Sequence, residues 1–284
     1  MKMQSKLINT NGIQLHYLDS ASDNNDQLET VLFIHGLTAN AHAFDAIIQN
    51  GLDHQYRILS VDLRGRGLSE QPDNGYTMLD HAKDIVGMLQ QLNIKSIHIV
   101  GHSFGGFLGI YLAIYYPTIV KKLLLLDAAV QMHPNTKEML GPALGRLGKT
   151  FDSFDSYINK VKQAPYLSFW DEAMLSYYHA DVFHNANGTV TPRSKPEHMM
   201  EAVLKGSLGM PWGEIIGLCQ KETILINAPG IYHLGAALLP EELAKETVNM
   251  LPNAKYQQVN GNHQTMLYGE GAKQIAAMIQ SFIK

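Results

Sequence analysis

The chain of 284 residues lacks the features that mark membrane, secreted and metal-binding proteins. Its one cysteine, Cys219, excludes an internal disulfide and a cysteine-rich metal site, and apolar neighbours predict that it is buried. No apolar run approaches the roughly 20 residues that span a bilayer, and the polar segment Met1–Lys6 does not lead into the apolar core of a signal peptide. We therefore expect a cytoplasmic protein that does not bind a membrane.

Motifs for metals, nucleotides and nucleic acids are also missing. The chain has no His-Glu-x-x-His, no paired cysteines and no glycine-rich loop that continues into Lys-Ser/Thr. It has no basic cluster, and its net charge is only −4. We therefore expect no cofactor, no metal and no nucleic-acid partner, and a small-molecule substrate without strong charge. The sequence gives no sign of an oligomeric state.

What the chain does contain is one sharp strand-to-helix turn. The β-favouring residues Ile97–Val100 lead into Gly101-His102-Ser103-Phe104-Gly105, and an apolar helix follows from Phe104 to Tyr116. Gly-x-Ser-x-Gly in this context is typical of a nucleophile elbow, where the glycines make room for a turn that displays the serine hydroxyl. The backbone N–H of Phe104 would then point to the place where an oxyanion forms. The alternative is an ordinary turn with an unused serine.

Strands and helices alternate along most of the chain. Asn11-Gly12 predicts a type I′ turn between two strands, and Thr77 with Asp80 predicts a capping box that opens a helix ending near Leu92. The other strands are short continuous apolar runs, which are typical of a parallel sheet covered on both faces. We expect an α/β fold with a mostly parallel central sheet and helices on both faces. Its further elements are a surface loop at 21–27, strands at 31–35, 57–62, 96–101, 122–127, 223–227 and 255–259, and helices at 240–250 and 271–282.

The segment from residue 130 to residue 210 breaks this alternation. It has no strand followed by a crossover helix, and it is rich in aromatic residues. We interpret it as a helical cap inserted into a core domain of residues 1–129 and 211–284, above the carboxyl ends of the strands, where sites in open α/β sheets form. A cap there would exclude water, and we expect Trp170, Tyr178 and His133 to contact the substrate. The alternative is a side domain without contact to the site.

Four motifs together resemble the α/β-hydrolase superfamily with a helical cap, and the resemblance covers nearly the whole chain. They are Phe33-Ile34-His35-Gly36-Leu37, Asp62-Leu63-Arg64-Gly65-Arg66-Gly67-Leu68-Ser69, Gly101-His102-Ser103-Phe104-Gly105-Gly106 and Gly261-Asn262-His263. The resemblance implies a serine hydrolase, and it implies that the backbone N–H of Leu37 is a second oxyanion donor beside that of Phe104. We expect the Asp62–Ser69 loop to support the elbow.

A serine hydroxyl is a poor nucleophile at neutral pH and needs a base within hydrogen-bond reach. His263 is the best candidate among 13 histidines, because it follows the last strand in a loop that can bend back toward the sheet edge. The unperturbed pKa of histidine also lies near the working pH. In the superfamily that this chain resembles, the histidine comes last in the triad. We therefore expect Ser103 to be the nucleophile and His263 the base.

The third member departs from the commonest pattern of the superfamily, which places an aspartate in the loop after the strand at 223–227. Here residues 228–237 contain no carboxylate. A second placement is known in the superfamily at the end of the preceding strand, and Asp127 stands there. A carboxylate beside the histidine loop could hold the imidazole tautomer. We expect Asp127 to be the acid; if it is only structural, the site is a dyad or uses Glu241.

These residues predict a hydrolase that cleaves a small to medium, mostly apolar carboxylic ester or lactone through an acyl-enzyme. One alternative is a carbon–carbon bond hydrolase that acts on a diketone. A second is a catalytically weak ligand sensor on the same fold. The missing acid after the late strand favours the sensor, whereas intact Ser103 and His263 favour the enzyme.

Overall fold

A computed structural model describes residues 3–21 and 28–284, so most of the loop expected at 21–27 lies outside the described residues. In this part of the chain the main sheet has eight strands in the order β1-β2-β4-β3-β5-β6-β9-β10. β1 and β2 are antiparallel, as are β2 and β4, and all other neighbours are parallel. The strands are β1 (Gln4–Thr10), β2 (Ile13–Asp19), β3 (Thr30–Ile34), β4 (Arg57–Val61), β5 (Ile97–His102), β6 (Val120–Leu126), β9 (Glu222–Asn227) and β10 (Ala254–Gln258).

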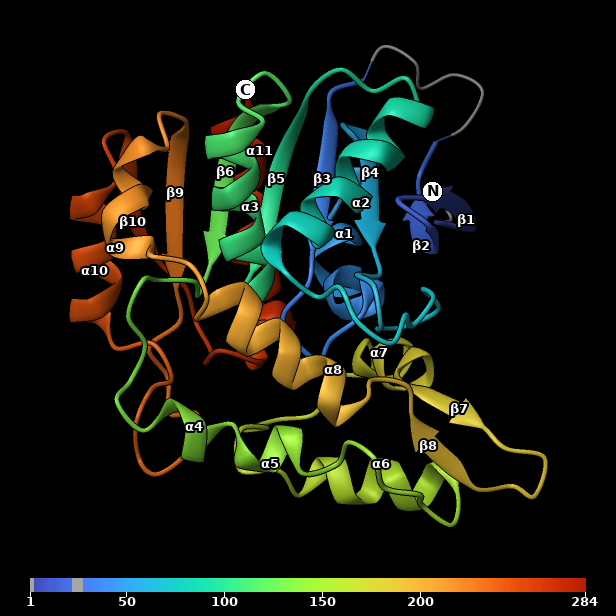
Figure 1. The fold of residues 1–284 in the computed structure, drawn as a ribbon. Coiled ribbons are helices and arrows are strands. Elements are labelled where there is room, and N and C mark those ends of the chain that lie inside the picture. Colours follow the sequence, from blue (N-terminus) through green and yellow to red (C-terminus); the bar gives the residue numbers. More distant parts are fainter. Residues whose placement is uncertain (1–2, 22–27) are drawn as a thin grey trace.

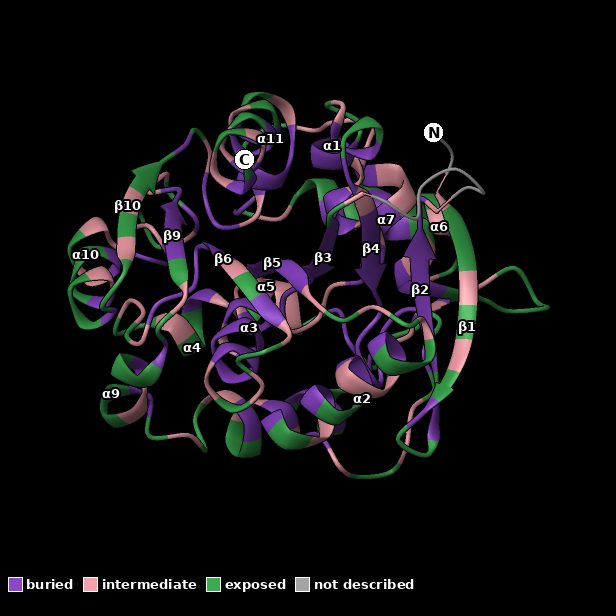
Figure 2. Ribbon diagram, turned by 90° about the horizontal axis from the view of Figure 1, so that it is seen from above, coloured by how far each residue is buried: buried purple, intermediate pink, exposed green. Residues whose placement is uncertain are grey.

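Helices cover both faces of this sheet, which confirms the predicted α/β fold class. Figure 2 shows α1 and α11 on one side of the strands and α2 and α3 on the other. Residues of β3 alternate between the two apolar cores, with Val31 and Phe33 in one and Leu32 and Ile34 in the other, because successive side chains of a strand point to opposite faces. The covering helices are α1 (Asp45–Ile48), α2 (Met78–Gln91), α3 (Phe104–Tyr115), α9 (Trp212–Ile215), α10 (Glu241–Met250) and α11 (Gly269–Ile283).

Local sequence signals fix two of the early elements. Asn11 and Gly12 have φ angles of 49° and 78°, as a type I′ turn between β1 and β2 requires. Thr77 and Asp80 form a reciprocal capping box at the start of α2. Both elements were predicted from these residues. No described helix combines the length and the apolarity needed to cross a membrane.

Residues 130–210 form a layer beyond the carboxyl ends of the parallel strands, at the bottom of Figure 1. This inserted segment contains α4 (Thr136–Met139), α5 (Gly141–Leu144), α6 (Phe154–Lys162), α7 (Met174–Asp181) and α8 (Pro196–Glu201), which runs on into a π-helical turn at Ala202–Ser207. It is not entirely helical, because β7 (Val182–His184) and β8 (Val190–Pro192) form an antiparallel hairpin around the turn at Asn187-Gly188. The expectation of a purely helical segment at 130–210 missed these two strands.

Candidate active site

Ser103 lies in the turn between β5 and α3, in a backbone conformation that non-glycine residues rarely adopt. Its φ is 52° and its ψ is −118°. A Cβ atom on Gly101 would lie 2.4 Å from the carbonyl oxygen of Gly105, and a Cβ atom on Gly105 would lie 2.0 Å from that of Ile34. Only glycine fits at these two positions, because α3 packs directly against the strands. Strain of this kind gathers at functional sites and holds the hydroxyl at the edge of the sheet.

His263 reaches the same edge from the loop after β10, and its imidazole meets Asp127. Nδ1 of His263 lies 2.9 Å from Oδ2 of Asp127. Asp127 follows β6 directly, is fully buried and has a φ of 48°. An ionised carboxylate only accepts hydrogen bonds, so Nδ1 of His263 carries the proton and Nε2 carries a free lone pair. This is the tautomer in which an imidazole can take a proton from a serine.

The second oxygen of Asp127 is held by the end of β9. Oδ1 accepts hydrogen bonds from Nδ2 of Asn227 and from the backbone N–H of Ala228, each at 2.9 Å. The carboxylate is therefore fixed on both oxygens, as a buried charge must be. Glu241, the alternative acid, lies instead in the first turn of α10, where it is paired with Lys245 at 2.5 Å.

Two other histidines near the site stay neutral at pH 7. Burial lowers the pKa of His102 well below its ordinary value, and burial lowers the pKa of His35 to about 4. Nε2 of His102 lies 2.8 Å from the carbonyl oxygen of His263, so it donates to that oxygen and fixes the backbone of the loop. His35 accepts from the backbone N–H of Leu63 at 3.0 Å. These rings position the chain around the site and are not placed to act as bases.

Two backbone N–H groups next to Ser103 have no hydrogen-bond partner among the described residues. One belongs to Phe104, at the start of α3, where helical N–H groups are always left over. The other belongs to Leu37, in the turn after β3. The carbonyl of Leu37 accepts from Nε of Arg66 at 2.9 Å, so the Asp62–Ser69 loop holds this turn in place. This loop was expected to support the elbow. In the structure its side chain Arg66 holds the neighbouring turn at Leu37.

One cavity of about 70 Å³ brings these groups together. Ser103, His263 and Leu37 all line it, and residues of α5 and α7 in the inserted segment form part of its wall. The Ser103 hydroxyl makes no hydrogen bond within residues 3–21 and 28–284, and bonds of this type tighten when substrate fills a site. The wall is otherwise mostly apolar, and its main contributors are Leu140, Ala143, Leu144, Tyr177, Tyr232 and Leu267.

The three substrate contacts expected from the inserted segment do not line this cavity. Tyr178 is buried and stacks on Trp170, with ring centroids 5.8 Å apart. His133 accepts from the backbone N–H of Asn135 in the loop before α4. Tyr177, one residue before Tyr178, lines the cavity in its place. The sequence offered no means to choose between these neighbours, because both are tyrosines in one helix.

The site holds no cluster suited to a metal ion. Across the described residues, no group of three or more histidine, cysteine, aspartate or glutamate side chains is arranged to hold one. The groups that the site does bring together are a hydroxyl, an imidazole oriented by a carboxylate, and two backbone donors. Those are the parts that acyl transfer requires.

Comparison with known proteins places this arrangement in a family. The model of the alpha/beta hydrolase fold matches residues 29–199. The chain belongs to the α/β-hydrolase fold family, which confirms the resemblance inferred from its motifs. A crystal structure of E-2-(acetamidomethylene)succinate hydrolase shares the fold, with a TM-score of 0.83 over 99% of each chain at 20% sequence identity.

Two relatives of known activity are similar over part of the chain. A cis-3-alkyl-4-alkyloxetan-2-one decarboxylase of Shewanella oneidensis is 29% identical over 188 residues, which cover 61% of this chain and 57% of that protein. A 3-hydroxybutyrate-oligomer hydrolase of Cupriavidus necator is 34% identical over 131 residues, which cover 45% of this chain and 44% of that protein. These matches span less than two thirds of the relatives' own length.

Proposed function

We propose that the protein is a serine hydrolase that cleaves a small to medium, mostly apolar carboxylic ester or lactone. Ser103 attacks the carbonyl carbon while Nε2 of His263 takes its proton. The N–H groups of Leu37 and Phe104 stabilise the resulting oxyanion. The imidazolium then returns the proton to the leaving alcohol, an acyl-enzyme forms, and water cleaves it by the same steps in reverse order.

The observation that carries this proposal is the hydrogen bond between Nδ1 of His263 and Asp127. It leaves the basic nitrogen of the imidazole free beside a cavity that the hydroxyl of Ser103 also lines. The small, mostly apolar wall of that cavity supports an uncharged group at the reacting carbonyl. The contact with Asp127 supports an acid in place of the one that the loop after β9 lacks, and so it favours an enzyme over a ligand sensor.

The inserted segment acts as a cap in this proposal. Side chains from α5 and α7, at residues 143, 144 and 177, form part of the wall around Ser103. Closing an active site expels water, which strengthens the electrostatic interactions within it. The cap therefore selects the size of the acyl group and protects the acyl-enzyme until a single water enters.

A fluorophosphonate probe tests the nucleophile. We expect a covalent adduct on the peptide that holds Ser103, and none in Ser103→Ala. Ser281→Ala is the matched control, because Ser281 lies exposed on α11 and donates to the carbonyl of Met278. The same pair is compared on p-nitrophenyl acetate, with Ser103→Ala losing turnover at an unchanged thermal midpoint. A labelled Ser103→Ala variant, or one that keeps turnover within tenfold, contradicts the assignment.

A further inference from the structure

The wall of the cavity at Ser103 contains two phenol hydroxyls that the protein leaves without a partner. Tyr177 of α7 and Tyr232 of the loop after β9 both line this cavity, and they are only 4% and 2% exposed. Neither hydroxyl has a hydrogen-bond partner in the described part of the chain. Neither oxygen is enclosed by protein atoms, so both hydroxyls open onto the cavity that their residues line.

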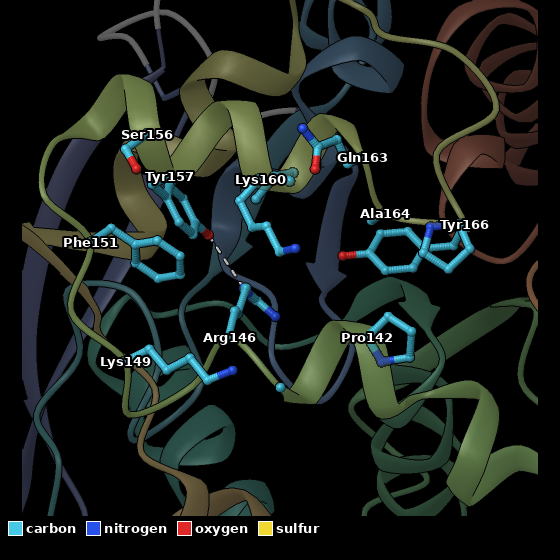
Figure 3. A pocket seen from close by; sticks show the side chains of 13 residues that line it. Pro142, Arg146, Lys149, Phe151, Ser156, Tyr157, Lys160, Gln163, Ala164 and Tyr166 are labelled. Atoms are coloured by element: carbon cyan, nitrogen blue, oxygen red, sulfur yellow. Dashed lines mark hydrogen bonds between the residues drawn. The ribbon is translucent and has the colours of Figure 1, made fainter.

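Buried tyrosine hydroxyls usually find a hydrogen-bond partner, because an unpaired polar group away from water costs free energy. Tyr157 of α6, in the same inserted segment, shows the usual case. Its hydroxyl donates to Asp181 and accepts from Nε of Arg146, and Figure 3 shows the second of these bonds. Tyr177 and Tyr232 lack such partners, so a group that enters the cavity has two free phenols to bind.

Tyr232 is held beside the imidazole of His263. Its ring meets that of His263 edge to face, with ring centroids 5.8 Å apart, and stacks on Tyr166 with centroids 5.2 Å apart. The neighbouring Asn262 donates to the carbonyls of Ile231 and Tyr166, at 2.8 and 3.0 Å. The loop that carries the proposed base therefore also fixes the phenol of Tyr232.

Tyr177 is held against the turn that carries the proposed oxyanion donor Leu37. Its carbonyl accepts from Nδ2 of Asn40 in that turn, at 3.0 Å. The hydroxyl of the preceding residue, Ser176, donates to Asp45 of α1 at 2.6 Å. These bonds tie α7 to the core domain. A ligand that accepts a hydrogen bond from a side chain on such a fixed helix has little conformational freedom to remove.

Both phenols act as neutral donors. Burial raises the pKa of Tyr177 and the pKa of Tyr232, so each hydroxyl keeps its proton at neutral pH. Among the described residues that line this cavity there is no aspartate, glutamate, lysine or arginine. A charged ligand group would therefore lose its hydration without gaining an opposite charge in the wall. The group that suits the two phenols is an uncharged oxygen that accepts hydrogen bonds.

We propose that Tyr177 and Tyr232 form a hydrogen-bonding subsite for a second oxygen atom of the substrate, that of a ketone, ether or hydroxyl group. The inference rests on the proposed hydrolase function and names a substrate class for it: esters or lactones with an uncharged oxygen near the scissile bond. A cavity of about 70 Å³ holds only a few non-hydrogen atoms, so this oxygen lies within a few atoms of the reacting carbonyl. A hydrocarbon chain of the same size would leave both hydroxyls unpaired and is bound less well.

Two pairs of esters test the subsite, because the members of each pair differ only in one oxygen that replaces a carbon. Methyl acetoacetate and methyl isovalerate differ in the acyl part, and 2-methoxyethyl butyrate and butyl butyrate differ in the alcohol part. We expect the ratio of kcat/KM values, oxygen-bearing over hydrocarbon ester, to fall roughly three- to tenfold for at least one pair in Tyr177→Phe or Tyr232→Phe. Phenylalanine keeps the ring and removes only the hydroxyl. The pair that responds tells which part of the substrate carries the oxygen.

Tyr178→Phe is the matched control. Tyr178 follows Tyr177 in α7, is equally buried and does not line the cavity, so the same loss of a hydroxyl should leave both ratios as they are. The subsite is overturned if neither Tyr177→Phe nor Tyr232→Phe lowers either ratio about threefold. It is also overturned if Tyr178→Phe lowers the same ratio as much.

Binding to Ser103→Ala separates failure of the subsite from failure of the hydrolase proposal. If the wild type cleaves none of the four esters, the hydrolase proposal fails for these probes, and binding decides the subsite alone. The four esters are titrated by ligand-observed NMR into Ser103→Ala and into Ser103→Ala/Tyr177→Phe/Tyr232→Phe. A preference of Ser103→Ala for an oxygen-bearing ester that the triple variant loses supports the subsite. No preference, or the same preference in both proteins, overturns it.

Discussion

Replacing Asp127 by asparagine tests the proposed acid through the hydrogen bonds that surround it. In the wild type, Oδ1 accepts from Asn227 and Ala228, and Oδ2 accepts from Nδ1 of His263. An amide has a single oxygen, and that oxygen has to face the two fixed donors at the end of β9. Its nitrogen then faces His263 and donates to Nδ1. The imidazole proton moves to Nε2, the atom that should take the proton of Ser103.

The variant therefore keeps its packing and loses its base. General-base catalysis contributes 10²–10⁴-fold, so we expect kcat to fall by ~10²-fold or more, which corresponds to ~2.7 kcal/mol of barrier. All three hydrogen bonds to side chain 127 persist in the variant, so the thermal midpoint should move by no more than a few degrees. Hydrolysis of p-nitrophenyl acetate and thermal unfolding measure the two quantities on one preparation.

Glu241→Gln is the matched control for this substitution. It makes the same change from carboxylate to amide in a side chain that is 44% exposed and paired with Lys245. We expect its kcat to stay within twofold of the wild type. The reasoning is refuted if Asp127→Asn keeps kcat within tenfold of the wild type, or if Glu241→Gln loses as much as Asp127→Asn.

Three further predictions follow from contacts around the site. Arg66→Met frees the carbonyl of Leu37 and should lower kcat by ~10- to 100-fold with little change in KM, because a small displacement of an oxyanion donor is costly. The control Arg64→Met removes a hydrogen bond to Asp84 on α2 and should lower stability but leave kcat unchanged. Equal kcat values for the two variants would contradict this prediction. Leu144→Ala widens the cavity at Ser103 and should shift the preferred p-nitrophenyl ester toward acyl chains that are roughly two to three carbons longer, whereas an unchanged profile would show that α5 does not limit size. Burial lowers the pKa values of the buried His35, His81 and His102, so the unfolded state binds more protons below pH 6.5 and the free energy of unfolding should fall as the pH drops below that value, with His35 contributing ~1.4 kcal/mol per pH unit down to about pH 4. Urea titrations at pH 7.5 to 5 measure this fall, and a flat profile would argue against neutral burial of these three rings.

Local signals in the sequence predicted the parts of the fold that depend on local chemistry. A turn with two positive φ angles needs residues such as Asn11 and Gly12, and a capping box needs a pair such as Thr77 and Asp80, so these residues predict structure directly. The turn at Ser103 belongs to the same class, because close packing of α3 on the strands demands Gly101 and Gly105. Each of these elements is present in the structure where the residues indicated it.

The direction in which the side chains of the inserted segment point could not be predicted in this way. Consecutive residues of a helix differ by about 100° in direction, since a turn contains 3.6 residues. Tyr177 and Tyr178 therefore face different neighbours, and only the position of α7 over the sheet decides which of them reaches the cavity. The hairpin of β7 and β8 was missed for a related reason: strands of three residues are too short to show a period of two.

The position of Asp127, the proposed acid, shows why a missing residue in a motif is weak evidence against a function. The loop after β9 has no carboxylate, yet the end of that strand contacts the proposed acid, because Asn227 and Ala228 donate to Asp127 directly after the neighbouring strand β6. β6 and β9 are adjacent and parallel, so their carboxyl ends meet at one edge of the sheet. A carboxylate after β6 comes from a different loop than a carboxylate after β9. The imidazole of His263, which approaches from the loop after β10, still reaches it. The loop after β9 then needs hydrogen-bond donors in place of an acid, and that is what Asn227 and the backbone at Ala228 provide.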